Sequence, residues 1–259
     1  SDSVVYLGLH NRLPELKSFK EIKFESFTED DLFEKITPLN LDLIINCIGY
    51  TNVENCEINF ARAEDINAKI AANIAKVSNA LNIKLVHIST DQLFDGSVGD
   101  YDEESPVVPL NNYAITKSLG EKLVFRFNSN ALVIRTNFFG WGPSFKHSFS
   151  DYIITRLESK KRVSLFSDVF YNPILVSELA DAVMHLVSKG CGGIFNVVSS
   201  DTVSKLEFGF LLAEEFGLDS SLIDASRIVS RKELVRRPLN MTLSSNKLRR
   251  EGVKVASLK

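Results

Sequence analysis

The chain contains few of the residues that hold disulfide-rich or zinc-binding domains together. Its 259 residues include four histidines and only three cysteines, Cys47, Cys56 and Cys191. An odd number of cysteines without C-x-x-C spacing argues against a disulfide framework and against a zinc site. We therefore expect free thiols in a reducing, cytoplasmic compartment, and no bound metal.

Long apolar runs and an excess of one sign of charge are also missing. No run approaches the ~20 residues that a transmembrane helix needs, and no charged-then-apolar segment opens the chain. The formal net charge of −3 gives no electrostatic reason to expect nucleic acid or a membrane as a partner. The length is sufficient for a sizeable core, in one large domain or in a domain with an appendage.

What the chain does have is a regular alternation of strand-like and helical segments. Strand-like runs lie at 4–7, 41–47, 85–89, 131–135 and 194–198, and helical patterns at 61–81, 113–127 and 176–188. This order predicts an α/β fold with a Rossmann-like, doubly wound parallel sheet between two layers of helices. The alternation breaks at Gly140-Trp141-Gly142-Pro143. We therefore expect a dinucleotide-binding domain over residues 1–140. Residues 141–259 should form a smaller α/β substrate-binding region, with some segments returning to the main sheet.

Two short strings carry the strongest chemical signal. Ser89-Thr90-Asp91 follows a strand-like run, and Tyr113 and Lys117 stand four residues apart on one face of a predicted helix. A neighbouring ammonium lowers the pKa of a phenol from its usual value of about 10, so this pair can act as a general acid or base. Thr90 could hydrogen-bond the oxygen that Tyr113 protonates or deprotonates. Taken alone, Y-x-x-x-K is equally typical of a surface helix pair.

Longer strings occur in the same order as in a known family. They are Asp42–Thr51 (DLIINCIGYT), Ser89–Gly96 (STDQLFDG), Pro109–Glu121 (PLNNYAITKSLGE) and Arg237–Leu248 (RPLNMTLSSNKL). Together they resemble the extended short-chain dehydrogenase/reductase family, and within it the dTDP-4-dehydrorhamnose reductases. The resemblance implies NADP(H)-dependent reduction of a 4-keto-6-deoxy nucleotide sugar, an oxidoreductase step in deoxysugar and cell-surface polysaccharide biosynthesis. An epimerase or dehydratase of the same fold, or a non-catalytic regulatory subunit that retains the fold, stays open as an alternative.

The resemblance also implies roles for particular residues. Tyr113 would protonate the C4 oxygen, Lys117 would lower the pKa of Tyr113 and hold the nicotinamide ribose, and Thr90 would orient the carbonyl. The implied substrate-binding residues are Thr90, Asp91, Phe138 and Arg237. The implied cofactor-binding residues are Arg12, Ser26, Phe27, Gly49, Tyr50, Thr51, Tyr113 and Lys117. Arg237 would pair with the substrate diphosphate, although a structural salt bridge explains such a residue equally well. The family also allows a homodimer.

Two departures from the family pattern affect the cofactor. The first strand and its glycine-rich turn, G-x-x-G-x-x-G, do not occur in the sequence. Without that central strand two inner strand edges would be unpaired, so we expect a shortened N-terminus; a true loss would remove phosphate binding at the helix N-terminus. In addition, Gly8 stands where NAD-preferring members carry an acidic residue, and Arg12 follows it. An arginine without the acidic residue favours the 2′-phosphate of NADP, with NAD as the alternative.

Overall fold

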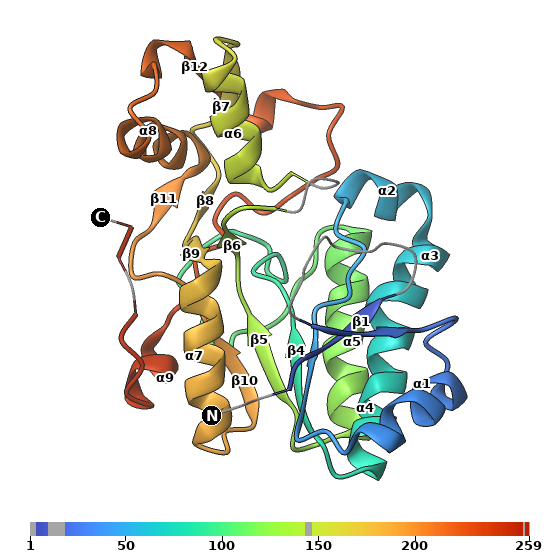
Figure 1. Cartoon of the computed structure of the whole chain (residues 1–259). Coiled ribbons are helices and arrows are strands. Elements are labelled where there is room, and N and C mark those ends of the chain that lie inside the picture. Colours follow the sequence, from blue (N-terminus) through green and yellow to red (C-terminus); the bar gives the residue numbers. More distant parts are fainter. Residues whose placement is uncertain (1–3, 10–18, 143–146, 256, 259) are drawn as a thin grey trace.

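The computed structural model describes residues 4–9, 19–142, 147–255 and 257–258 (Figure 1). Arg12 therefore lies outside the described residues. The centre of the molecule is a parallel sheet with the strand order β10-β5-β4-β3. Its strands are β3 (Leu43–Asn46), β4 (Lys84–Ile88), β5 (Leu132–Arg135) and β10 (Gly193–Asn196). The prediction of a Rossmann-like α/β fold is confirmed.

The two faces of this sheet pack against different helices (Figure 1). Because side chains alternate along a strand, Leu85 and Val133 join the cluster on the side of α4 (Ile70–Ala80) and α5 (Asn112–Phe127). Val86, Leu132 and Ile134 face the other way and pack with α7 (Val176–Ser188). Every residue of β5 is buried, as expected for a parallel strand covered on both faces.

The N-terminal strands form a separate sheet. In the described part of the chain, β1 (Tyr6–Leu9) pairs only with β2 (Lys20–Lys23), and β3 pairs only with β4. In the described residues these two strand pairs therefore lie in separate sheets. Ile45 is 44% exposed, because among the described residues no strand pairs with the second edge of β3.

A second layer of structure covers the carboxyl end of the sheet (Figure 1). It contains α6 (Phe149–Glu158), β7 (Val163–Phe166), β8 (Phe170–Tyr171), β11 (Val203–Ser204), α8 (Lys205–Glu215) and β12 (Ile223–Ser226). The buried Tyr171 and Phe208 lie at the centre of its apolar cluster. Strands β6 (Phe138–Phe139) and β9 (Ile174–Leu175) connect this layer to the sheet, and α9 (Asn246–Arg250) packs near β10. The division near residue 140 stays a prediction.

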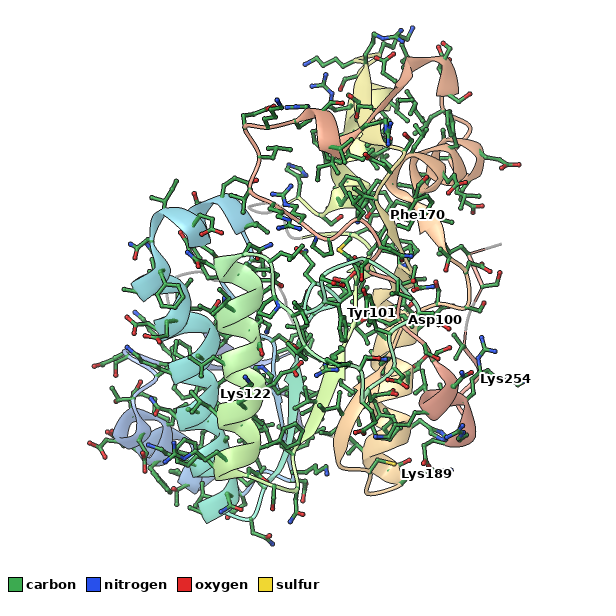
Figure 2. All side chains as sticks on the ribbon, turned by 180° about the vertical axis from the view of Figure 1, so that it is seen from behind. Asp100, Tyr101, Lys122, Phe170, Lys189 and Lys254 are labelled. Carbon is green, nitrogen blue, oxygen red and sulfur yellow. The ribbon has the colours of Figure 1, made fainter. Side chains whose placement is uncertain are left out.

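One extended segment, residues 239–244, joins this layer to the loop after β4. On one side, the Phe170 N–H donates to the Leu239 carbonyl at 2.7 Å. On the other side, the Tyr101 N–H donates to the Thr242 carbonyl at 3.0 Å, and the Asp100 N–H donates to the Thr242 hydroxyl at 2.7 Å. Asp100, Tyr101 and Phe170 can be located in Figure 2. We call residues 239–244 the bridging segment.

The helical pattern predicted for residues 61–81 is not one regular helix. After α1 (Glu29–Ile36) and α2 (Val53–Ile58), the chain forms α3 (Phe60–Glu64), a π-helical turn η2 (Asp65–Lys69), and then α4. The short 3-10 turns are η1 (Thr37–Leu39), η3 (Ser220–Leu222) and η4 (Ile228–Ser230). Single π-helical turns inside helices occur frequently at functional sites. Here the turn carries the buried Asn67.

Gly120 fixes the distance between α5 and this π-helical turn. A Cβ atom at Gly120 would lie 2.4 Å from the Asn67 carbonyl oxygen, which is backbone and cannot rotate away. We expect Gly120→Ala to reduce the free energy of unfolding by about 1–3 kcal/mol, measured by urea denaturation. Gly209→Ala in α8 is the matched control, because its Cβ would meet only the flexible end of Leu165. Equal stability of the two variants would show that the helices separate at little cost.

Candidate functional site

A cavity of about 840 Å³ lies at the carboxyl ends of β3 and β4, below the second layer. Open α/β sheets bind their ligands at this edge. The cavity brings together eight of the residues that the sequence singled out. They are Gly49, Thr51, Thr90, Asp91, Tyr113, Lys117, Phe138 and Arg237. The two strings that flank the loop after β4 therefore belong to one site.

Thr90 and Asp91 form the polar floor of the cavity. The Asp91 carboxylate accepts a hydrogen bond from Asn137 Nδ2 at 2.7 Å and one from the Thr90 hydroxyl at 3.3 Å. Burial raises the pKa of Asp91 to about 6, and the hydrogen bond from Asn137 opposes this shift. The aspartate is thus held in a fixed orientation next to Thr90.

Tyr113 lies in the first turn of α5, which begins where the Asn111 side chain accepts a hydrogen bond from the Ala114 N–H. Burial raises the pKa of Tyr113 to about 12, a hydrogen bond with Thr90 lowers it, and the charge of Asp91 raises it. The expected lowering by Lys117 is not what the structure gives. The phenol is therefore protonated at neutral pH and is hydrogen-bonded to Thr90.

Lys117 lies one turn further along α5 and is almost completely buried. Its Nζ donates a hydrogen bond to the Ile88 carbonyl at 2.7 Å, at the end of β4. Burial lowers the pKa of Lys117 to about 8, whereas the Glu121 carboxylate raises it. Tyr113 and Lys117 do share a helix face, as their spacing predicts. The Lys117 ammonium, however, is hydrogen-bonded to the end of β4 and not to Tyr113.

Gly49, Tyr50 and Thr51 follow β3, and Asn67 holds this loop in place. The Asn67 side chain accepts a hydrogen bond from the Tyr50 N–H at 2.7 Å and donates to the Tyr50 carbonyl at 3.2 Å and the Thr116 hydroxyl at 3.0 Å. Gly49 and Thr51 line the cavity, whereas the Tyr50 ring packs beside Cys56 and Tyr113. The π-helical turn thus connects the loop after β3 to α5.

Ser26 and Phe27 lie away from the cavity. Phe27 is 9% exposed, has a left-handed backbone (φ 53°), and stacks on Phe24 with 5.0 Å between ring centroids. Ser26 is exposed, and its N–H donates to Asp31 at 3.0 Å. Phe27 is therefore a core residue in this structure. The contact of either residue with a cofactor stays a prediction.

The remaining two expected substrate residues come from the second half of the chain. Phe138 in β6 is 52% exposed and lies on the cavity wall. Arg237 also lines the cavity, and its guanidinium forms an ion pair with Glu54 at the start of α2. This ion pair is the salt bridge that the sequence left open for Arg237, and it connects the two halves of the chain across the site.

Sequence reasoning missed several residues of the site. Asn137 holds Asp91, and Lys205 and Tyr171 contact one another beside the same carboxylate. Asn137 directly precedes Phe138, which the sequence did single out, so it could have been found. Lys205 carries no such signal, because it lies in an ordinary helix-start pattern far along the sequence.

The described part of the chain contains neither a metal-ligand cluster nor a membrane-spanning helix. Among the described residues, no group of three or more histidine, cysteine, aspartate or glutamate side chains is placed to hold a metal ion. Within these residues, no helix combines the length and the apolar character that crossing a membrane requires.

The fold and the cavity define a class of protein. A Rossmann-like sheet with threonine, tyrosine and lysine side chains at one strand-end cavity is the arrangement of the short-chain dehydrogenase/reductase type. The family model of the RmlD substrate binding domain matches residues 15–258. The chain belongs to this family.

Individual relatives agree with that membership. The "Probable low-salt glycan biosynthesis reductase Agl14" of Haloferax volcanii is 32% identical, over 74% of this chain and 66% of that protein. The dTDP-4-dehydrorhamnose reductase of Mycobacterium tuberculosis is 30% identical, over 69% of this chain and 60% of that protein. The chain thus spans less than two thirds of the length of these relatives. The crystal structure of the Bacillus anthracis dTDP-4-dehydrorhamnose reductase in complex with NADP has a TM-score of 0.87 at 22% identity, over 99% of this chain and 96% of that chain.

Proposed function

We propose that the chain reduces a 4-keto-6-deoxy nucleotide sugar of the dTDP-4-dehydrorhamnose type, with NADPH as the reductant. The observation that carries this proposal is the position of Thr90, Tyr113 and Lys117 around one cavity. The family membership and the names of the relatives support the choice of substrate. A homodimer stays a prediction from the resemblance.

Each of the three side chains has a role in this reaction. Tyr113 is protonated at neutral pH because burial raises its pKa, so it can donate a proton to the C4 oxygen as that oxygen gains negative charge. Thr90, which is hydrogen-bonded to Tyr113, orients the same oxygen. Lys117 places positive charge beside the tyrosine that has lost its proton, and its pKa of about 8 keeps most of it charged at neutral pH.

The residues present fit one end of a dinucleotide cofactor. Gly49, Thr51 and Lys117 line the cavity beside Tyr113, where the nicotinamide and its ribose would lie. A bound NADPH supplies the hydride that reaches C4 of the sugar. At Gly49 even an added Cβ would have only ordinary contacts of 3.5 Å or more, so the loop leaves room for a ligand. Arg12, proposed for the 2′-phosphate, lies outside the described residues.

The test follows the absorbance of NADPH with dTDP-4-dehydrorhamnose as substrate, and NADH in a parallel assay. We expect NADPH to be consumed in a one-to-one ratio with the sugar. An epimerase or dehydratase would change the sugar without net consumption of NADPH. Binding of NADPH without turnover of any 4-keto nucleotide sugar would contradict the proposal.

A further inference from the structure

Lys205 extends from the start of α8 into the cavity that holds Thr90 and Tyr113. Its ammonium lies 3.2 Å from the centroid of the Tyr171 ring and 4.8 Å from that of Phe149. Within the described parts of the chain, no hydrogen bond or ion pair is found at this ammonium. Aromatic faces are thus its nearest neighbours on the protein side.

This position is unfavourable for a cation that has only a structural role. Burial lowers the pKa of Lys205 to about 8; the charge of Asp91 opposes this shift, and the positive charge of Arg237 contributes to it. Lys205 also occupies the first position of α8, where the helix dipole disfavours positive charge. The cation–π contact with Tyr171 offsets only part of the free energy that the ammonium loses when it leaves water. These costs indicate that the charge of Lys205 has a role in binding a ligand.

The charges around the cavity indicate what the ammonium binds. Arg237 forms an ion pair with Glu54. Asp91 attracts Lys205 but is hydrogen-bonded to Asn137 and Thr90, and its own pKa is raised to about 6. The Lys205 ammonium therefore has N–H donors that are not hydrogen-bonded to described residues. It lines the same cavity as Arg237. Phosphate oxygens are strong acceptors for such a group.

We propose that Lys205 binds a phosphate oxygen of the nucleotide sugar and, together with Arg237, sets the position of the sugar ring over Thr90 and Tyr113. This inference rests on the proposed function, because it takes the nucleoside diphosphate from the proposed substrate. Lys205 is a positioning residue, since its contact is with the diphosphate and not with the reacting carbonyl. Arg237 needs to release Glu54, or share its guanidinium with it, when the diphosphate binds.

The test compares the binding of dTDP and of thymidine to wild type, Lys205→Met and Lys205→Arg by titration calorimetry. We expect Lys205→Met to weaken dTDP binding by about 10- to 100-fold, as the loss of a charged hydrogen bond does. Thymidine binding should not change, and Lys205→Arg should keep most of the dTDP affinity. Lys122→Met is the matched control, because Lys122 is exposed on α5, away from the cavity (Figure 2).

The outcomes separate this inference from the proposed function, because dTDP binding needs no turnover. If wild type reduces the sugar and Lys205→Met binds dTDP normally, the proposed role of Lys205 is wrong and the proposed reductase function is unaffected. A raised KM of that variant for the sugar nucleotide would then indicate that Lys205 contacts the sugar and not the diphosphate. Wild type that does not bind dTDP would also overturn the role of Lys205. If dTDP binding depends on Lys205 but no NADPH is consumed, the role of Lys205 is supported and the reductase function is contradicted.

The melting temperature of Lys205→Met is the control for folding. We expect it at or above that of wild type, and such a value would exclude a folding defect.

Discussion

Tyr113→Phe is expected to remove most of the proposed reductase activity, with kcat about 10²- to 10⁴-fold lower at neutral pH, because the phenol is the proposed proton donor. The ring remains, so the apolar contacts with Val53, Cys56 and Ala63 are kept. Loss of the hydroxyl also removes an acceptor or donor for Thr90. Steady-state kinetics with NADPH and the 4-keto sugar nucleotide measures the effect.

The same variant should bind dTDP as wild type does, because Tyr113 acts on the carbonyl and not on the nucleotide. Tyr6→Phe in β1 is the matched control, since it removes a phenol outside the cavity. Activity of Tyr113→Phe within threefold of wild type would show that water or another residue supplies the proton.

Glu121→Gln reduces the free energy of unfolding by about 3–5 kcal/mol, because it leaves a buried guanidinium without its carboxylate. Arg135 Nη2 donates to Glu121 at 2.8 Å and Arg135 Nε at 3.1 Å, and the two side chains are 3% and 6% exposed. This ion pair connects α5 to β5 in the middle of the sheet. Chemical denaturation of the variant and of wild type measures the loss.

The double variant Glu121→Met/Arg135→Met should recover much of the loss, since an apolar pair leaves no uncompensated charge. Asp224→Asn is the surface control. It breaks the exposed ion pair with Arg162 and should change the denaturation midpoint little. Glu121 also raises the pKa of Lys117, so Glu121→Gln should lower the pKa of Lys117 further. A denaturation midpoint of Glu121→Gln equal to that of wild type would contradict the interpretation.

The sequence was informative wherever chemistry and secondary structure lie close together along the chain. Thr90 at a strand end and Tyr113 and Lys117 on one helix face could be predicted, because each depends on local periodicity. Their shared cavity followed from the rule that parallel strands meet their ligands at one edge.

Features that depend on tertiary packing could not be predicted in this way. The burial of Phe27 requires a left-handed backbone that no pattern indicates. The π-helical turn around Asn67 interrupts an apolar period that reads as one helix. The direction of the pKa shift of Tyr113 depends on how completely the phenol is buried, whereas the Y-x-x-x-K spacing suggested the opposite direction. Lys205 comes close enough to Asp91 to affect its pKa only because α8 folds back over the carboxyl end of the sheet.

The bridging segment has a consequence for the order in which the protein acquires its structure. Asp100 contacts Thr242 across 142 positions of sequence, and Glu54 contacts Arg237 across 183. Contacts of such long range slow folding, because closing a long loop costs entropy before any contact is made. At typical rates of synthesis, Arg237 is added on the order of 10 to 40 s after Glu54. Until then the central sheet can pack its helices, but the second layer is not yet joined to the loop after β4. We expect the nascent chain to expose the apolar cavity during synthesis, and to bind nucleotide only after the bridging segment has been made.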